Sequence, residues 1–330
     1  MSETVLVTGS TGFIGARLLR RLVDEGQRVK VLLRPESRPE QQTGTVETVR
    51  AAYGDAKALL DAVRGVDRII HLAGVTKAAD NSGFEAGNVT PLKNLLAAVR
   101  EANPSLKRFL LVSSLAAAGP ASEGIRGVNE SDEASPVSEY GRSKLRAEQF
   151  GMENSGGIPF TIVRPPAVYG PGDRDVLQVF RMLSKGLLVS AGNAGRQRFS
   201  MIFVDDLVRG IIAAARSPEA SGRIYYITSS SSWSWDDVIE AARPAIGFGG
   251  LVRVSLPKPL VFMLGTVAGA AGSLTGRPSI LSIDKARELV EDYWVCDPGR
   301  AREELGFTAG TTLAEGIGKT ISWYRNHGWM

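Results

Sequence analysis

A tyrosine and a lysine four residues apart carry the clearest chemical signal in the chain. Tyr140 and Lys144 precede residues 145–150, which follow a helical pattern. Residues four apart lie on one helix face, so the lysine ammonium can sit beside the phenol. A free tyrosine titrates near ~10, and a neighbouring positive charge favours the phenolate. The spacing therefore predicts a tyrosine whose pKa is lowered toward working pH, where it can transfer protons, although an ordinary surface pair would have the same spacing.

Two neighbouring serines are the next candidates. Ser113 and Ser114 directly follow residues 109–112, an apolar run that predicts a strand. A hydroxyl fixed at a strand end can donate a hydrogen bond to the carbonyl or alkoxide oxygen of a substrate. Serines at strand ends also serve simply to satisfy the backbone of the following loop.

Three glycines near the start of the chain predict a dinucleotide-binding turn. Gly9, Gly12 and Gly15 stand between a β-branched apolar run, 4–7, and a helical pattern, 16–23, and a second apolar run follows. This order predicts a strand, a turn, a helix and a strand. Gly9 can adopt angles that a side chain forbids, Gly12 lets the backbone approach a pyrophosphate, and Gly15 lets the helix pack closely. The free N–H groups of the helix would then face the phosphates.

Together these motifs resemble the short-chain dehydrogenase/reductase superfamily. The turn reads T-G-x-x-G-x-x-G, and the tyrosine motif reads Y-x-x-x-K. Residues 164–172 read R-P-P-A-V-Y-G-P-G and residues 203–207 read F-V-D-D-L, similar to signatures of the extended branch, the NAD-dependent epimerase/dehydratase family. The matches extend over about residues 4–230. Within this family the chain is most similar to the dihydroflavonol reductase and 3β-hydroxysteroid dehydrogenase-like branch.

The resemblance implies a set of site residues. Ser114, five residues before Gly119, takes the place of the catalytic hydroxyl, and it is favoured over Ser113, which would face the cofactor. Tyr140 becomes the general acid/base, and Lys144 tunes it and holds the nicotinamide ribose. Asn88 resembles the structural asparagine of the family. The implied cofactor-binding residues are Gly9, Thr11, Gly12, Phe13, Ile14, Gly15, Arg34, Asp55, Ala56, Leu72, Ala73, Gly74, Val112, Ser113, Tyr140, Lys144, Pro165 and Val168.

Arg34 is the residue that bears on cofactor choice. NAD-preferring relatives place an acid at the end of the second strand, where it binds the ribose 2′-hydroxyl. This chain has Arg34 there. Because a guanidinium suits a 2′-phosphate in charge and geometry, we expect NADP rather than NAD. The alternative is that Arg34 stacks on adenine and discriminates weakly, which would leave NAD as a cofactor.

The order of predicted elements indicates an α/β fold. Strands and helices alternate to about residue 170, as expected of a Rossmann-type doubly wound parallel sheet covered on both faces. We expect residues 1–170 to form the dinucleotide-binding domain, with 204–228 returning to it. Residues 171–203 and 229–330 would form a smaller C-terminal substrate-binding lid.

Composition excludes several classes of protein. The formal net charge of +4 over 330 residues predicts no nucleic-acid surface. A single cysteine, Cys296, excludes an internal disulfide and favours a reducing, cytoplasmic location, and no signal peptide is evident. With only His71 and His327 present, neither a serine–histidine hydrolase nor a multi-histidine metal site is expected. His71 reads as a packed residue at a strand end.

An apolar run near the C-terminal third has several interpretations. Residues 260–272 are apolar and rich in small side chains, but they are fewer than the ~20 needed to span a bilayer. A core helix or a wall of the substrate pocket is the favoured interpretation. Peripheral membrane contact and a homodimer face are the alternatives.

The motifs leave three functions open. The first is hydride transfer between the nicotinamide and a small, fairly apolar carbonyl or alcohol substrate. The second is a nucleotide-sugar epimerase with the same serine, tyrosine and lysine. Many such enzymes have an asparagine at the position of Ala167 and an arginine at that of Phe199, with Arg198 one position away here, so the first is favoured. The third is a non-catalytic NADP-binding sensor, against which the intact Ser114, Tyr140 and Lys144 argue.

Overall fold

The computed structural model describes residues 3–37, 46–122, 126–275 and 282–330. Its main feature is a seven-stranded parallel sheet in the order β10-β6-β5-β4-β1-β2-β3. The strands are β1 (Thr4–Thr8), β2 (Arg28–Leu33), β3 (Val46–Arg50), β4 (Arg68–His71), β5 (Arg108–Val112), β6 (Phe160–Arg164) and β10 (Arg223–Tyr226). The expected α/β fold with a Rossmann-type sheet is confirmed.

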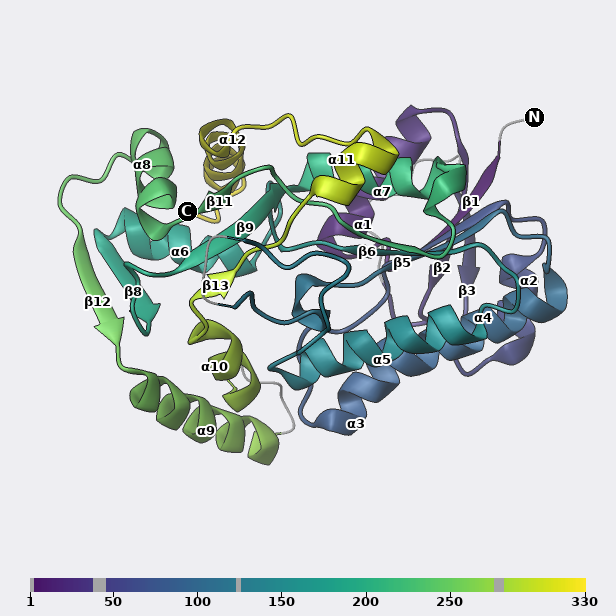
Figure 1. Cartoon of the computed structure of the whole chain (residues 1–330), viewed down its shortest axis with the longest axis horizontal. Helices are drawn as coiled ribbons and strands as arrows, with labels where there is room; N and C mark the ends of the chain where they lie inside the picture. Colours follow the sequence, from purple (N-terminus) through teal and green to yellow (C-terminus); the bar gives the residue numbers. More distant parts are fainter. Residues whose placement is uncertain (1–2, 38–45, 123–125, 276–281) are drawn as a thin grey trace.

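Helices cover both faces of this sheet (Figure 1). One face packs against α1 (Phe13–Asp24) and α7 (Val204–Arg216). The other packs against α2 (Ala56–Val63), α4 (Thr90–Ala102) and α5 (Glu139–Asn154). Successive strand residues point to opposite faces, so Val5 and Val7 enter the first core and Leu6 enters the second. Short helical segments complete this part: α3 (Asn81–Phe84), η1 (Glu85–Val89), η2 (Leu115–Ala117) and η3 (Pro218–Ala220).

The strand order reverses at β1, which lies between β2 and β4. From β1 the chain passes to β2 and β3 on one side, and then to β4, β5 and β6 on the other. Ligands of open α/β sheets bind at such a reversal, beyond the carboxyl ends of the strands. The glycine turn follows β1, and the serines follow β5, so both lie at this edge.

The second part of the chain builds two small sheets and their helices. In one sheet β9 pairs with β7, β11 and β13, and in the other β8 pairs with β12. The strands are β7 (Ala167–Tyr169), β8 (Leu187–Ala191), β9 (Arg198–Phe203), β11 (Ser232–Trp233), β12 (Val252–Leu256) and β13 (Tyr293–Trp294). The helices are α6 (Asp175–Ser184), α8 (Trp235–Ile246), α9 (Lys258–Thr275), α10 (Ile283–Leu289), α11 (Gly299–Leu305) and α12 (Leu313–Asn326).

Two elements bear on the predicted boundaries between the domains. Strand β7 lies before residue 170, yet it pairs with β9 of the lid region. Ala301 of α11 and the following Phe307 belong to the core cluster that α1 and α7 form on the main sheet. The two parts are therefore interleaved along the chain, and the exact domain limits stay a prediction.

The apolar run predicted at residues 260–272 lies within α9. This helix packs on α10 at the periphery, far from the main sheet in Figure 1. Met263 and Val267 are 55% and 65% exposed, so the run does not form a core helix. Within the described ranges, no helix has both the length and the apolar character needed to cross a membrane.

Candidate active site

A cleft of about 1530 Å³ extends from the glycine turn to the lid. It opens at the carboxyl ends of β1, β4 and β5, where the strand order reverses. Most of the predicted site residues line it, namely Gly9, Thr11, Gly12, Phe13, Ile14, Gly15, Leu72, Gly74, Val112, Ser113, Ser114, Tyr140, Lys144, Pro165 and Val168. Residues of the lid form the opposite wall, which places a large ligand between the two parts of the chain.

The glycine turn has no room for side chains. Gly9 has a φ of +71°, and a Cβ there would lie 2.7 Å from the backbone nitrogen of Ala73. A Cβ on Gly15 would lie 2.1 Å from the carbonyl oxygen of Gly9, because the helix approaches the turn so closely. Helix α1 begins after Gly12 with no side-chain cap and no acid in its first turn. Its N–H groups and positive dipole end are therefore available to a phosphate, which fits a dinucleotide.

A buried hydroxyl next to the turn supports the same fit. Ser113 is 5% exposed, and its Oγ has no hydrogen-bond partner within the described part of the chain. Buried hydroxyls normally have a partner, so this one calls for a polar group from a ligand. Since Ser113 lines the cleft, a cofactor lying along β5 would supply that group.

Four predicted cofactor residues lie outside the lining of the cleft: Arg34, Asp55, Ala56 and Ala73. The Arg34 side chain is 61% exposed and pairs with Glu36 at 3.2 Å. Asp55 caps α2 by accepting a hydrogen bond from the Ala58 N–H at 3.0 Å, and Ala56 is the first residue of that helix. Asp55 thus has a structural task of its own, and its contact with adenine stays a prediction.

The structure brings Ser114, Tyr140 and Lys144 together at the cleft. Ser114 Oγ accepts a hydrogen bond from the Ala116 N–H at 3.1 Å, and it is also hydrogen-bonded to the Tyr140 hydroxyl. Lys144 Nζ donates to the Val112 carbonyl oxygen at 2.8 Å. Because the serine oxygen already accepts from the backbone, its proton is available to a substrate oxygen or to the phenol.

Burial favours the neutral form of both Tyr140 and Lys144. It raises the pKa of Tyr140 to about 12, an effect that the Ser114 hydrogen bond opposes and that the charges of Glu288 and Asp175 reinforce. It lowers the pKa of Lys144 to about 8. The expectation of a lowered pKa for Tyr140 also depends on the positive nicotinamide ring, so it stays a prediction for the cofactor-bound site; among the protein groups alone, desolvation outweighs the Ser114 hydrogen bond.

Asn88 fixes the geometry behind the tyrosine–lysine pair. It is 2% exposed and lies in η1, a π-helical turn. Its Oδ1 accepts from the Val75 N–H at 2.8 Å, and its Nδ2 donates to Ser143 Oγ at 2.8 Å and to the Val75 carbonyl at 3.1 Å. Asn88 therefore ties the loop after β4 to the middle of the catalytic motif, a structural role of the kind the resemblance implies.

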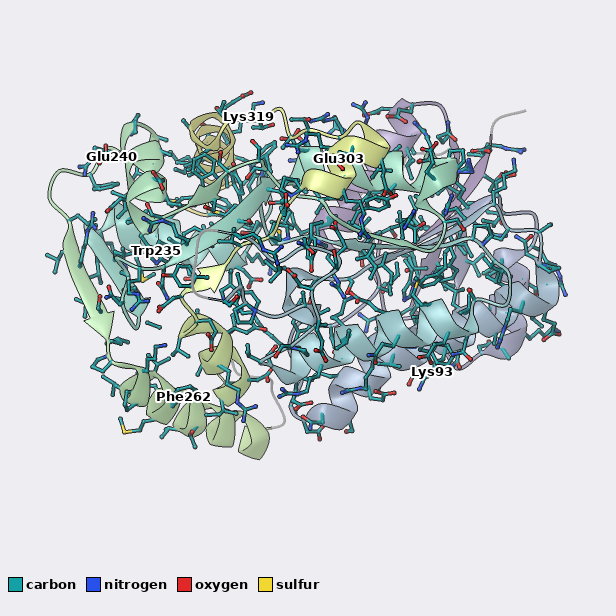
Figure 2. The ribbon with its side chains drawn as sticks, in the orientation of Figure 1. Lys93, Trp235, Glu240, Phe262, Glu303 and Lys319 are labelled. Atoms are coloured by element: carbon teal, nitrogen blue, oxygen red, sulfur yellow. The ribbon has the colours of Figure 1, made fainter. Side chains whose placement is uncertain are left out.

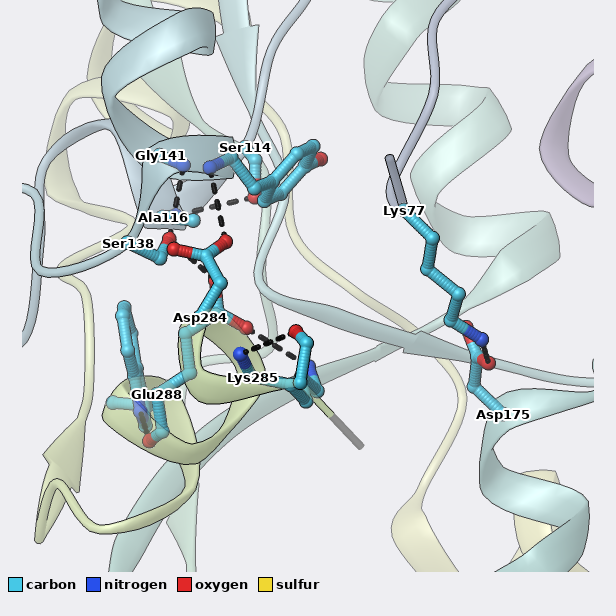
Figure 3. A network of polar contacts seen from close by, with 12 residues as sticks. Lys77, Ser114, Ala116, Ser138, Gly141, Asp175, Asp284, Lys285 and Glu288 are labelled. Carbon is cyan, nitrogen blue, oxygen red and sulfur yellow. Dashed lines mark hydrogen bonds and ion pairs between the residues drawn. The ribbon is translucent and has the colours of Figure 1, made fainter. Parts of the chain in front are cut away.

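A lid helix holds the start of α5, as Figure 3 shows. The Asp284 carboxylate on α10 accepts hydrogen bonds from the backbone N–H groups of Glu139 and Tyr140, at 2.5 and 3.2 Å. Ser138, the N-cap of α5, donates from its Oγ to Glu288 Oε1 at 2.7 Å. Sequence analysis missed Asp284 and Glu288, because nothing local to residues 284–288 marks them as partners of a helix about 140 positions earlier.

The lid wall of the cleft carries aromatic side chains among charged and polar ones. Phe199 and Trp235 meet edge to face with their ring centroids 5.1 Å apart, and both line the cleft. Ala167 also lines it. Cations of the lid line it as well: Arg174, whose guanidinium lies 5.2 Å from the Trp329 ring centroid, Arg198, whose Nη1 donates to the Gln197 carbonyl oxygen at 3.0 Å, and Lys285, which pairs with Glu288 at 2.9 Å.

Two other titratable groups have no part in this chemistry. His71 is fully buried, its Nδ1 bonds Thr8 Oγ1 at 2.8 Å, and burial lowers its pKa to about 3. Burial raises the pKa of the Cys296 thiol to about 12. His71 is thus a neutral packed residue and Cys296 an unreactive thiol.

Known proteins resemble both the chain and this arrangement. The model of the NAD-dependent epimerase/dehydratase family matches residues 5–228. Ceramide reductase of Caulobacter vibrioides is 31% identical over 99% of this chain and 96% of its own length. UDP-glucose 4-epimerase of Vibrio cholerae is 23% identical over 97% of this chain and 95% of its own. The crystal structure of gox2253 has a TM-score of 0.81 at 23% identity, covers both chains completely, and bears on the fold alone.

Proposed function

Because the chain belongs to the NAD-dependent epimerase/dehydratase family, we propose that it is an NADP(H)-dependent reductase or alcohol dehydrogenase with an apolar ketone or secondary alcohol as substrate. The observation that carries this proposal is the convergence of Ser114, Tyr140 and Lys144 on a cleft that begins at a glycine turn. The relatives of this chain include reductases and epimerases, so the first two alternatives are both enzymes.

The three side chains divide the work of carbonyl reduction. Ser114 donates a hydrogen bond to the carbonyl oxygen and stabilises the negative charge that develops there. When bound, the reduced nicotinamide supplies the hydride to the carbonyl carbon. Tyr140 transfers its phenolic proton to the oxygen, which yields the alcohol and leaves a phenolate. The charged form of Lys144, held by the Val112 carbonyl, stabilises that phenolate from below and orients the ribose.

The aromatic part of the lid wall supports an apolar substrate. Phe199 and Trp235 line it, and Ala167 stands where many sugar-nucleotide enzymes carry an asparagine. An apolar pocket with a few converging polar groups suits a hydrophobic ketone. The ceramide reductase that shares 31% of its residues with this chain is, by its name, a lipid-acting reductase. We therefore propose a lipid-like ketone as the substrate class.

We favour NADP(H) as the cofactor because of Arg34. This side chain is 61% exposed at the end of β2, where an acid would repel a 2′-phosphate. Its ion pair with Glu36 is exposed, so exchanging that partner for a phosphate costs little.

One observation favours a nucleotide-sugar epimerase as the second candidate. Arg174 and Arg198 both line the cleft, and a diphosphate needs cationic donors of this kind. The Vibrio cholerae relative is an epimerase of UDP-glucose. Against it, Arg198 is engaged by the Gln197 and Gly195 carbonyl oxygens, and Arg174 lies against the Trp329 ring.

A paired substrate screen tests the proposal. The protein is mixed with NADPH and with either long-chain 3-keto lipids in detergent or UDP-sugars, and the NADPH absorbance is followed. We expect absorbance to fall only with the ketones. Sugar interconversion with bound nicotinamide would support the epimerase instead, and NADPH binding without any turnover would support the non-catalytic sensor.

A further inference from the structure

The exposed apolar side chains of this protein gather on one segment. Among the described residues, every large hydrophobic side chain that is exposed, apart from Met152, lies between residues 252 and 289. They are Val252, Val254, Met263, Leu264, Val267, Ile283 and Leu289. Exposed apolar residues scattered singly are ordinary, whereas a concentration in one region marks a contact surface.

Helix α9 forms the centre of this region (Figures 1 and 2). Its inner face packs on α10, where a Cβ on Gly265 would lie 2.9 Å from the Ser282 carbonyl oxygen and where Val261 is buried. Its outer face carries Met263, Leu264 and Val267, and the helix contains no charged residue after Lys258. A surface helix normally turns charged side chains to water, and this one does not.

The acidic and basic side chains near α9 differ in their partners and exposure. The acids of α10 turn inward, since Asp284 accepts from the start of α5 and Glu288 accepts from Ser138. The bases Lys258 and Arg287 are exposed, and neither has an ion pair within the described ranges. The two helices that carry the exposed apolar side chains thus each expose one of these cations, Lys258 at the start of α9 and Arg287 in α10, and positive charge complements an anionic surface.

The apolar region also borders the cleft. The other side of α10 contributes Lys285, Glu288 and Leu289 to the cleft lining. Leu289 is 41% exposed, so one side chain belongs to both the cleft wall and the apolar region. Helix α10 therefore lies between α9 and the cleft.

We propose that the outer face of α9, together with the exposed cations Lys258 and Arg287, docks on the surface of a membrane that contains anionic lipids. The apolar side chains enter the interface, and the cations meet the headgroups. That the docked cleft takes its substrate from the bilayer rests on the proposed function, whereas the docking itself does not. A second copy of the chain is the competing occupant of the same face.

Vesicle sedimentation of the full chain tests the docking without any measure of activity. The vesicles are phosphatidylcholine alone or an equimolar mixture of phosphatidylcholine and phosphatidylglycerol. We expect binding to the mixture, and loss of roughly tenfold or more in affinity for the double variant Met263→Gln, Val267→Gln, because two buried apolar side chains are lost. Met152→Gln is the matched control, as an apolar side chain 38% exposed on α5, and it should bind as the wild type does.

A charge variant and the oligomeric state complete the experiment. Lys258→Glu with Arg287→Glu should weaken binding to the anionic vesicles by roughly fivefold or more per cation while the fold, measured by circular dichroism, stays unchanged. Wild-type protein that ignores both kinds of vesicle would overturn the proposal. So would a dimer in sedimentation equilibrium that the Met263→Gln, Val267→Gln variant splits, because the face would then be occupied by a second copy. Vesicle binding without reductase activity would leave the docking standing and reject only the proposed function.

Discussion

The phenol of Tyr140 is held in its protonated form by the protein around it. With a pKa raised to about 12, it is a proton donor throughout the neutral range. Reduction of a carbonyl needs such a donor, whereas oxidation of an alcohol needs the phenolate as a base. The positive nicotinamide of an oxidised cofactor acts in the opposite direction to burial, since it favours the anion. At the scale of single residues, burial therefore favours the proton donor that reduction needs, and a bound oxidised cofactor would favour the base that oxidation needs.

Replacing Tyr140 by phenylalanine removes the proton donor and keeps the ring against Phe84, whose centroid is 6.2 Å away. Turnover of a confirmed ketone should fall by roughly 10²–10⁴-fold, the range for a lost general acid. NADPH affinity, measured by titration calorimetry, should stay within a few-fold of wild type because the glycine turn is untouched. A variant that turns over at nearly the wild-type rate would show that another group donates the proton.

Arg34 and Arg64 allow a matched test of cofactor choice. Both side chains are 61% exposed and pair with an acid two or three residues away, but only Arg34 follows β2. Arg34→Asp should weaken NADPH binding by tenfold or more and leave NADH binding little changed or improved, because the carboxylate repels the 2′-phosphate. Arg64→Asp should change neither affinity. Equal affinities of the wild type for NADPH and NADH would contradict the assignment of Arg34.

At the scale of elements, the sequence predicts features that depend on neighbouring residues. It does not predict contacts between segments far apart in the chain. The strand, glycine turn and helix at residues 4–24 could be predicted because the spacing of three glycines between an apolar run and a helical pattern is itself local, even though the backbone that confines Gly9 belongs to Leu72 and Ala73. The α10 cap on α5 joins segments 144 or more residues apart, and neither carries a motif. The burial that raises the pKa of Tyr140 likewise comes from the whole fold rather than from the lysine four residues along, so the sequence does not reveal it.

The placement of the apolar run shows a further limit of sequence patterns. Residues 260–272 have the composition of a core helix, and the helix does form, as α9. Whether another element covers its outer face depends on the path of β12 and α10, which a composition cannot reveal. A covered α9 would have confirmed the interpretation as a core helix, and the exposure of Met263 and Val267 contradicts it.

The contact of α10 with α5 predicts that a lid residue affects catalysis. Asp284→Ala removes both acceptors from the first turn of α5, a loss comparable to that of a helix cap, about 0.5–2 kcal/mol. The N–H groups of Glu139 and Tyr140 lose their partners, so the tyrosine is less well positioned and kcat should fall severalfold. The dissociation constant for NADPH should change less, because Asp284 touches neither the glycine turn nor β5.

Asp236→Ala is the control for the effect of Asp284. Asp236 also lies in the first turn of a lid helix, α8, but its carboxylate pairs with Arg253 on β12 and not with α5. Its replacement should leave kcat unchanged at a small cost in stability, because the ion pair is exposed. If the two variants lose kcat to the same extent, the effect is one of general destabilisation and the contact with α5 is not specific.

For the whole molecule, the cleft lies between a sheet domain and a lid that share elements. Strand β7 pairs with lid strand β9, α11 packs with the main sheet, and Lys77 bridges to Asp175 at 3.2 Å across the cleft. Figure 3 shows this bridge apart from the α10 contacts, on different elements. A ligand that fills the cleft adds contacts to both parts, so its binding should raise the stability of the whole chain.

This linkage gives a test that separates the two enzymatic candidates by ligand chemistry alone. A ligand at a hundred times its dissociation constant adds about 2.7 kcal/mol to the folded state, which is visible as a rise in melting temperature. We expect NADPH to give this rise, because the glycine turn offers free N–H groups to its phosphates. UDP and dTDP should give none, because Phe199 and Ala167 offer a diphosphate no donor side chain and Arg198 is already engaged with backbone carbonyls. A shift with millimolar UDP or dTDP that adds to the NADPH shift would instead identify a diphosphate site in the lid and favour the epimerase.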